Sequence, residues 1–135
     1  MSSAALTHDE TAVRDVLDRM YQAWAAQDPD AIAALYLDDV SVVMPGVYRS
    51  GSDEVGSYFA AGFAGPLKGS RASDEVRSIR FAAPGAAIVV SEGGVLMAGE
   101  TTVAPARRVR ATWVLASRDG QWRIAAYHNC LLQAR

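Results

Sequence analysis

Cysteine and histidine are scarce in this chain, which holds one cysteine, Cys130, and two histidines, His8 and His128. A single cysteine cannot form an internal disulfide, and such scarcity is typical of a reducing compartment, so we expect a cytoplasmic protein. A common structural zinc site needs about four ligands. One cysteine and two histidines do not supply them, so the sequence predicts no metal and no other cofactor.

The chain also lacks an excess of basic charge and a long apolar run. Its 13 Lys and Arg residues against 15 Asp and Glu residues leave a net charge of −2, so the basic footprint of a nucleic-acid-binding protein is missing. No apolar stretch approaches the roughly 20 residues that span a membrane. Residues 1–5 carry no Lys or Arg ahead of an apolar block, so a secretory signal is not expected. We therefore expect no nucleic-acid partner and no membrane.

The overall composition and length are typical of one globular domain. Half of the residues are hydrophobic and 21% are charged, which excludes the disordered and fibrous classes. A length of 135 residues suits a single core. No linker, internal repeat or low-complexity stretch divides the chain, so we predict one domain over residues 1–135.

Three helices are predicted in the first half of the chain. The first covers residues 9–26, where apolar side chains recur at helical spacing. The second starts at Asp28, an acidic N-cap followed by Pro29 at the first helical position. A β-branched run at residues 40–44 indicates a strand, and the third helix follows over residues 50–63.

The second half changes to the two-residue alternation that is typical of β-strands. The predicted strands cover residues 76–81, 87–97, 107–117 and 121–131. We expect a bulge or a kink at Gly93 and Gly94, and a hairpin turn at Asp119 and Gly120. Helices followed by an antiparallel meander predict an α+β fold, with a curved sheet wrapped around the helices. No strand leads into a glycine-rich phosphate loop, so nucleotide binding is not indicated.

A resemblance to a known superfamily is carried by residues 24–36 (WAAQDPDAIAALY) and by the DDV that follows at residues 38–40. These residues resemble the opening of the nuclear-transport-factor-2-like superfamily, which includes SnoaL-like polyketide cyclases and ketosteroid isomerase. The ending DGQWRI at residues 119–124, followed by YHN at residues 127–129, looks like its SgcJ/EcaC branch. The resemblance implies a cone-shaped, cystatin-like fold with one deep apolar pocket, often as a dimer. It also implies a role in bacterial natural-product biosynthesis, enediyne and polyketide pathways included.

The catalytic residues of ketosteroid isomerase are not matched in this chain. That enzyme uses a tyrosine, a carboxylate base and a protonated aspartate in its pocket. An ungapped count from Asp28 finds other residues at these positions: Met20, Met44, and Ala111 or Thr112. Proton abstraction by the same three groups is therefore not predicted.

Three weaker possibilities for the chemistry remain. Tyr21 lies next to the position of the missing tyrosine, so it is retained as a second candidate catalytic residue. SnoaL-like cyclases imply an acidic residue in the pocket, but no Asp or Glu follows Asp119. Asp74 with Arg77 or Arg80 resembles only part of the Asp–Arg–Asp arrangement of limonene-epoxide-hydrolase-type members.

The first candidate acid or base is His128. Because side chains alternate along a strand, His128 shares a face with Ile124 and Trp122. Those apolar side chains should meet the helices, so His128 is predicted to point into the cone. Imidazole titrates near neutral pH, which suits proton transfer. The alternative is a structural histidine that is hydrogen-bonded to a helix residue or to the backbone.

Methionine and aromatic side chains are predicted to line the pocket, because they adapt to or stack on a flat hydrophobic ligand. The alternative is that many of them are simply core. The predicted lining residues are Met20, Trp24, Met44, Tyr48, Tyr58, Phe59, Phe63, Met97 and Trp113.

An exposed face of the last strands is predicted to form a homodimer through the sheet. Its expected residues are Thr112, Val114, Ala116, Ala125, Tyr127 and Asn129. Three functions stay open at this point. The protein is an enzyme or enzyme-like accessory that acts on a hydrophobic intermediate through His128, a non-catalytic module that binds a small hydrophobic molecule, or an interaction domain whose dimer is the function.

Overall fold

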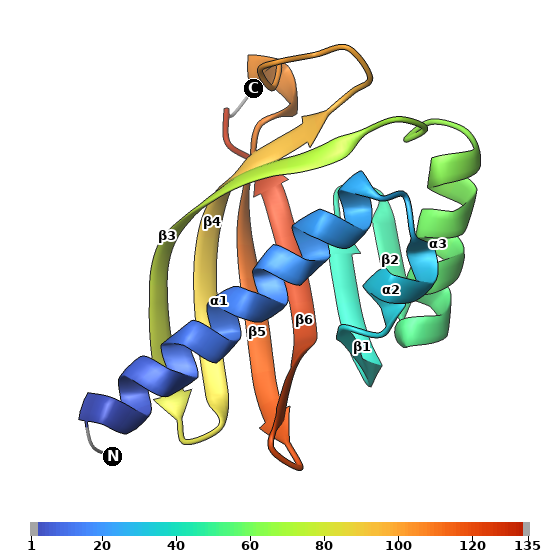
Figure 1. Ribbon diagram of the computed structural model, residues 1–135. Coiled ribbons are helices and arrows are strands. Elements are labelled where there is room, and N and C mark those ends of the chain that lie inside the picture. The colour runs from blue at the N-terminus through green and yellow to red at the C-terminus, as the bar shows by residue number, and fades with distance from the viewer. Residues whose placement is uncertain (1–2, 134–135) are drawn as a thin grey trace.

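The structure, a computed structural model that describes residues 3–133, has the predicted α+β architecture (Figure 1). Helix α1 (Ser3–Ala25) lies across one face of a six-stranded sheet. Helices α2 (Pro29–Ala33) and α3 (Ser52–Ala64) lie at the end of that sheet formed by the first two strands. The strands are β1 (Tyr36–Met44), β2 (Val47–Ser50), β3 (Arg71–Ala83), β4 (Ala86–Leu96), β5 (Val109–Arg118) and β6 (Gln121–Leu131).

The strand order across the sheet is β2-β1-β6-β5-β4-β3. The predicted antiparallel meander is present from β3 to β6. Strand β1, whose partner the sequence did not predict, joins the meander parallel to β6. This pairing places the first strand of the chain beside the last one, and it brings α3 to the open end of the curved sheet.

Local sequence signals account for most of the element ends. Asp28 caps α2, and its side chain accepts a hydrogen bond from the Ala31 backbone N–H at 3.1 Å. Asp119 and Gly120 both have positive φ, 54° and 77°, as a tight β-hairpin turn requires. Helix α1 reaches further toward the N-terminus than the predicted residues 9–26.

The core fills the space between α1, α3 and the inner face of the sheet. Val13 and Leu17 of α1 are fully buried, as are Leu115 of β5 and Ile124 of β6. Burying one such side chain contributes about 1.5–3 kcal/mol. The apolar face of α1 therefore holds the helix against the sheet and closes one side of the cone.

The pairing of β3 with β4 is continuous through Gly93 and Gly94, with no register shift there, so these glycines do not form a bulge between the two strands. Asp74 lies opposite Gly93, and Ser73 lies opposite Gly94. A Cβ at Gly93 would lie 2.0 Å from the Ser73 carbonyl oxygen and 2.7 Å from the Asp74 Cα. Glycine at this position therefore allows a close approach of two backbones.

Strand β6 contains a β-bulge at Ala125. Val114 of β5 pairs with Ala126, but the next residue, Leu115, pairs with Ile124. The extra residue shifts the alternation of side chains by one position. Ile124 is buried before the bulge, whereas after it the odd-numbered residues, beginning with Tyr127, face the helices.

Candidate functional site

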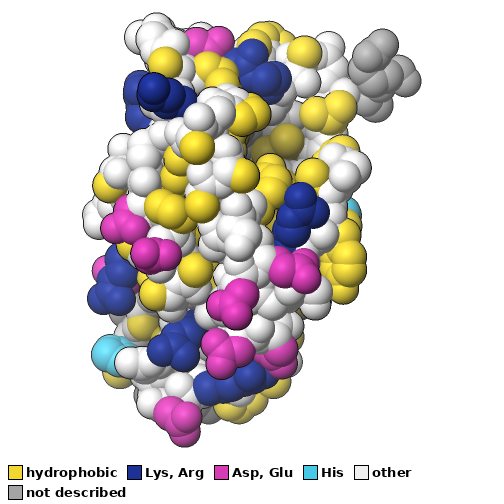
Figure 2. All heavy atoms as spheres, turned by 90° about the vertical axis from the view of Figure 1, so that its right-hand side faces the viewer, with side chains coloured by type: hydrophobic (Ala, Val, Ile, Leu, Met, Phe, Trp, Pro, Cys, Tyr) yellow, Lys and Arg dark blue, Asp and Glu magenta, His cyan; other side chains and the backbone are white. Residues whose placement is uncertain are grey.

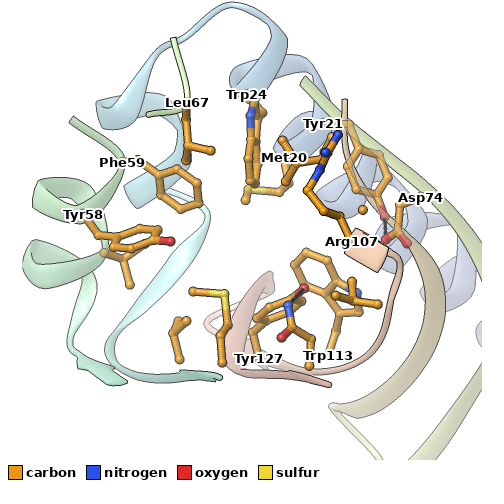
Figure 3. Close-up of a pocket in the computed structure, with 18 of the residues that line it drawn as sticks. Met20, Tyr21, Trp24, Tyr58, Phe59, Leu67, Asp74, Arg107, Trp113 and Tyr127 are labelled. Atoms are coloured by element: carbon orange, nitrogen blue, oxygen red, sulfur yellow. Dashed lines mark hydrogen bonds between the residues drawn. The ribbon is translucent and has the colours of Figure 1, made fainter. Parts of the chain in front are cut away.

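An apolar cavity of about 390 Å³ lies inside the cone (Figure 3). Its walls come from α1, α3, the inner face of the sheet and the loop between β4 and β5, which contains a short 3-10 helix, η1 (Pro105–Arg107). Figure 2 shows a hollow on the α3 side of the molecule, with hydrophobic side chains visible inside it. A cavity of this size is typical of a site for a small molecule.

Most of the predicted lining residues meet at this cavity. The structure places Met20, Trp24, Met44, Tyr58, Phe59, Met97 and Trp113 in its wall. Tyr21, the second candidate catalytic residue, also lines it. Their contact with a ligand stays a prediction.

Tyr48 and Phe63 do not line the cavity, so their predicted positions are wrong. Tyr48 is 62% exposed because it pairs with the exposed Val43, and both side chains point away from the helices. Its neighbour Arg49 faces the cavity instead. Phe63 lies in the core, where its ring packs against Trp24 and Phe59.

His128 is exposed and lies outside the cavity, so the prediction that it points into the cone is wrong. The bulge at Ala125 is the physical reason, because it moves the even-numbered residues that follow it to the outer face. The same shift moves Tyr127 and Asn129 from the predicted dimer face to the cavity wall. His128 therefore has no access to a ligand in the cavity.

A hydrogen-bonded pair, Tyr21 and Asp74, joins α1 to β3 at the cavity wall (Figure 3). The Tyr21 hydroxyl donates to Asp74 Oδ2 at 2.7 Å. Burial, together with the negative charge of Asp74, raises the pKa of Tyr21 above its ordinary value. Tyr21 therefore keeps its proton at neutral pH and holds the carboxylate in place.

A second polar pair is formed by Tyr127 and Asn129 on β6. Asn129 Nδ2 donates to the Tyr127 hydroxyl oxygen at 2.9 Å. Burial raises the pKa of Tyr127 to about 12, so its hydroxyl is protonated at neutral pH and can donate. Within residues 3–133, Asn129 Oδ1 is buried and has no hydrogen-bond partner.

Two tryptophans give the cavity much of its apolar wall. The indole N–H of Trp24 donates to Ser70 Oγ at 2.9 Å. The indole N–H of Trp113 donates to Ser91 Oγ, also at 2.9 Å. Both serines are buried. Because these donors are already bound to protein, the indoles present carbon to the cavity.

The charged side chains in the cavity wall are Arg49, Asp74 and Arg107. Arg107 forms an ion pair with Glu100 in the β4–β5 loop. The guanidinium carbon of Arg49 lies 5.2 Å from the centre of the Tyr58 ring. Arg107 was predicted to begin a strand over residues 107–117, but it lies in η1 of the β4–β5 loop, which lines the cavity.

The structure shows no metal centre in the part of the chain that it describes, since no three His, Cys, Asp or Glu side chains there could hold an ion. Among the described helices, none is both long enough and apolar enough to cross a membrane.

The sequence did not predict Tyr127 and Asn129 as cavity residues, and it indicated Asp74 only as part of an incomplete Asp–Arg–Asp arrangement. A signal for Asp74 existed, because it alternates with the apolar Ala72 and Val76 on the inward face of β3. The sequence does not predict that Asp74 pairs with Tyr21, since the two residues are 53 positions apart in the chain. Tyr127 and Asn129 were hidden by the bulge.

Comparison with known proteins gives a family and a fold. A family model described as a SnoaL-like domain matches residues 13–132. Among curated proteins, no match to the chain was found.

Solved structures share the fold at low sequence identity. A domain of unknown function with a cystatin-like fold from Nostoc punctiforme is 23% identical, with a TM-score of 0.86 over 99% of this chain and 81% of that one. An NTF2-like protein with a cystatin-like fold from Novosphingobium aromaticivorans is 16% identical, with a TM-score of 0.81 over 98% of this chain and 87% of that one. A candidate scytalone dehydratase from the same organism is 16% identical, with a TM-score of 0.76 over 99% of this chain and 94% of that one.

Proposed function

The chain belongs to the SnoaL-like domain family, and from this premise we propose that it binds a small, mostly apolar molecule and transfers a proton on it. The observation that carries the proposal is the Tyr21–Asp74 hydrogen bond of 2.7 Å in the wall of an otherwise apolar cavity. A carboxylate held in an apolar site is a suitable general base.

The roles of the polar side chains follow from their contacts. Asp74 accepts a proton from the bound molecule and returns it, while the Tyr21 hydroxyl orients the carboxylate. Tyr127 accepts a hydrogen bond from Asn129 and has its own proton free to donate to a ligand oxygen. Such a donor stabilises negative charge that develops on that oxygen. Proton removal and return of this kind produces an isomerisation or an elimination.

A non-catalytic binding module is the second candidate function. It is favoured by the same hydrogen bond, because the Tyr21 proton already satisfies one oxygen of Asp74 without a ligand. The two candidates share the cavity and the ligand, and they differ in whether Asp74 reacts.

A test reaction that does not require the natural substrate to be known distinguishes the two candidate functions. Ring opening of 5-nitrobenzisoxazole needs only a base, which removes the ring C–H proton while the N–O bond breaks to give a nitrile and a phenolate. We expect the protein to accelerate this reaction, and Asp74→Asn to lower the acceleration about a hundredfold. Asp53→Asn is the control, because Asp53 lies outside the cavity.

Two negative outcomes of these assays lead to different conclusions. If the fluorescent probe N-phenyl-1-naphthylamine binds the protein but Asp74→Asn does not slow ring opening, the protein is a binding module. If the probe does not bind, the cavity is not a ligand site and the proposal fails as a whole.

The biological setting is also a proposal. We propose that the ligand is a hydrophobic intermediate of bacterial natural-product biosynthesis, of an enediyne or polyketide type, and that the chain falls in the SgcJ/EcaC branch. Support comes from the sequence resemblance at residues 24–36 and 119–129. We place the protein in the cytoplasm on the ground of its single cysteine, Cys130.

A homodimer through the outer face of the sheet is proposed as well. Val43 is 40% exposed on this face, and Thr112 and Val114 lie on it nearby. An exposed apolar sheet face favours a two-fold partner. Sedimentation at micromolar concentration should give a dimer, and Val43→Glu should give monomers. A wild-type monomer would contradict the proposal.

A further inference from the structure

Arg49 stands at the mouth of the cavity. It lies on β2 opposite Val42, and both side chains face the inside of the cone. Arg49 lines the cavity and also a shallow groove outside it, along α3. Figure 2 shows the hollow on this side bordered by basic side chains, with acidic ones gathered below it.

The charge of Arg49 is not neutralised by the protein. Its Nη1 donates to the Tyr48 carbonyl oxygen at 2.9 Å, and its guanidinium lies over the Tyr58 ring. Over the described chain, residues 3–133, no carboxylate forms an ion pair with it. Arg107, the other arginine of the cavity wall, is paired with Glu100. Arg49 therefore keeps free N–H donors at a half-buried position.

The acidic side chains that line the groove with Arg49 have other roles. Glu54 Oε1 accepts a hydrogen bond from the Ser50 backbone N–H at 2.9 Å. Asp53 and Glu54 both lie in the first turn of α3, where the helix dipole favours negative charge. Inside the cavity, Asp74 is bound to Tyr21. None of these carboxylates is within ion-pairing distance of Arg49.

We infer that the natural ligand is an amphipathic anion, with its apolar body in the cavity and a carboxylate or similar oxyanion on Arg49. This inference rests on the proposed function and names the class of its substrate. A guanidinium binds a carboxylate through two parallel N–H donors, and the Tyr58 ring fixes the plane of the guanidinium. Figure 3 shows Tyr58 and Asp74 on opposite sides of the cavity, so an anion beside Tyr58 leaves the far end of the ligand at the Tyr21–Asp74 pair.

Three probes with one bicyclic body test the inference. They are 1-naphthylacetate, 2-(1-naphthyl)ethanol and 2-(1-naphthyl)ethylamine, which end in an anion, a neutral hydroxyl and a cation. Their dissociation constants are measured by displacement of N-phenyl-1-naphthylamine. We expect the acetate to bind about tenfold more tightly than the alcohol, and the amine to bind more weakly than both.

Variants of Arg49 assign the preference to this side chain. Arg49→Gln should remove the advantage of the acetate and leave the affinity for the alcohol unchanged, while Arg49→Lys should retain part of it. Arg80→Gln is the matched control, because Arg80 is an exposed arginine of β3 outside the cavity wall. It removes the same charge and should change neither affinity.

The outcomes separate the two proposals. If the alcohol binds as tightly as the acetate, or if Arg49→Gln changes both equally, the inference is wrong and the proposed binding function stands. Tightest binding of the amine also overturns it, and would assign the recognition to Asp74. If none of the three probes binds, the proposed function fails together with the inference.

Discussion

Gly93→Ala tests how closely β3 and β4 approach beneath the candidate site. The added Cβ would lie 2.0 Å from the Ser73 carbonyl oxygen and 2.9 Å from Asp74 Oδ1. Carbon–oxygen contacts between neighbouring strands are about 3.3 Å or longer. The Ser73 oxygen belongs to the backbone and has no rotamer by which it can move aside. The two strands must therefore separate locally by more than about 1 Å.

The expected loss of stability follows from this separation of the two strands. Overpacking of this kind costs about 1–3 kcal/mol, and each backbone hydrogen bond that is weakened adds about 1 kcal/mol. We expect the free energy of unfolding to fall by about 3 kcal/mol. For a chain of this length, the midpoint of thermal unfolding should fall by about 10 °C. Binding should weaken too, because Asp74 lies directly opposite Gly93.

Urea unfolding, followed by tryptophan fluorescence, measures the effect. Gly120→Ala is the control, because a Cβ there meets nothing within 4 Å while φ is 77°. That variant carries only the conformational penalty of a left-handed alanine, about 1 kcal/mol. If Gly93→Ala costs no more than Gly120→Ala, the close approach of β3 and β4 is refuted.

The remaining predictions concern side chains on the two faces of the sheet and in the core. Burial raises the pKa of Tyr36 above its ordinary value, so its contribution to stability is fully present below about pH 10 and is lost as the pH rises further. In urea unfolding between neutral and alkaline pH, Tyr36→Phe should therefore lose stability less steeply than wild type above about pH 10; equal slopes for the two proteins would contradict this. His128→Ala should change probe binding and ring opening by less than about twofold, because His128 lies on the outer face. Tyr127→Ala should weaken probe binding, because Tyr127 lies in the cavity wall; a larger loss for His128→Ala would contradict the assigned faces of β6.

Residues that follow a simple period could be placed from the sequence. Met20 and Trp24 lie one turn apart on the apolar face of α1, and both line the cavity. The Asp119–Gly120 turn fixed the pairing of β5 with β6. Periodicity and turn chemistry are local, so they were sufficient for the elements and for much of the cavity wall.

Features that depend on register or on distant contacts could not be placed. One extra residue at Ala125 reverses the faces of the strand that follows, and no residue type there signals it. The Tyr21–Asp74 pair forms only because the fold brings α1 against the inner face of β3. Both exceptions lie at the candidate site, where His128 was predicted and Asp74, Tyr127 and Asn129 are found.

The serine partners of Trp24 and Trp113 determine what the cavity rejects. Each indole N–H is committed to a buried serine, so neither can compensate a hydroxyl of the ligand that loses its water on entry. An uncompensated hydroxyl costs about 1–3 kcal/mol in a protein interior. A ligand that places a hydroxyl against either indole is therefore penalised by up to about a hundredfold in affinity. Under the proposed function, the cavity therefore distinguishes close chemical relatives by the position of their hydroxyl groups, without any contact made for that purpose.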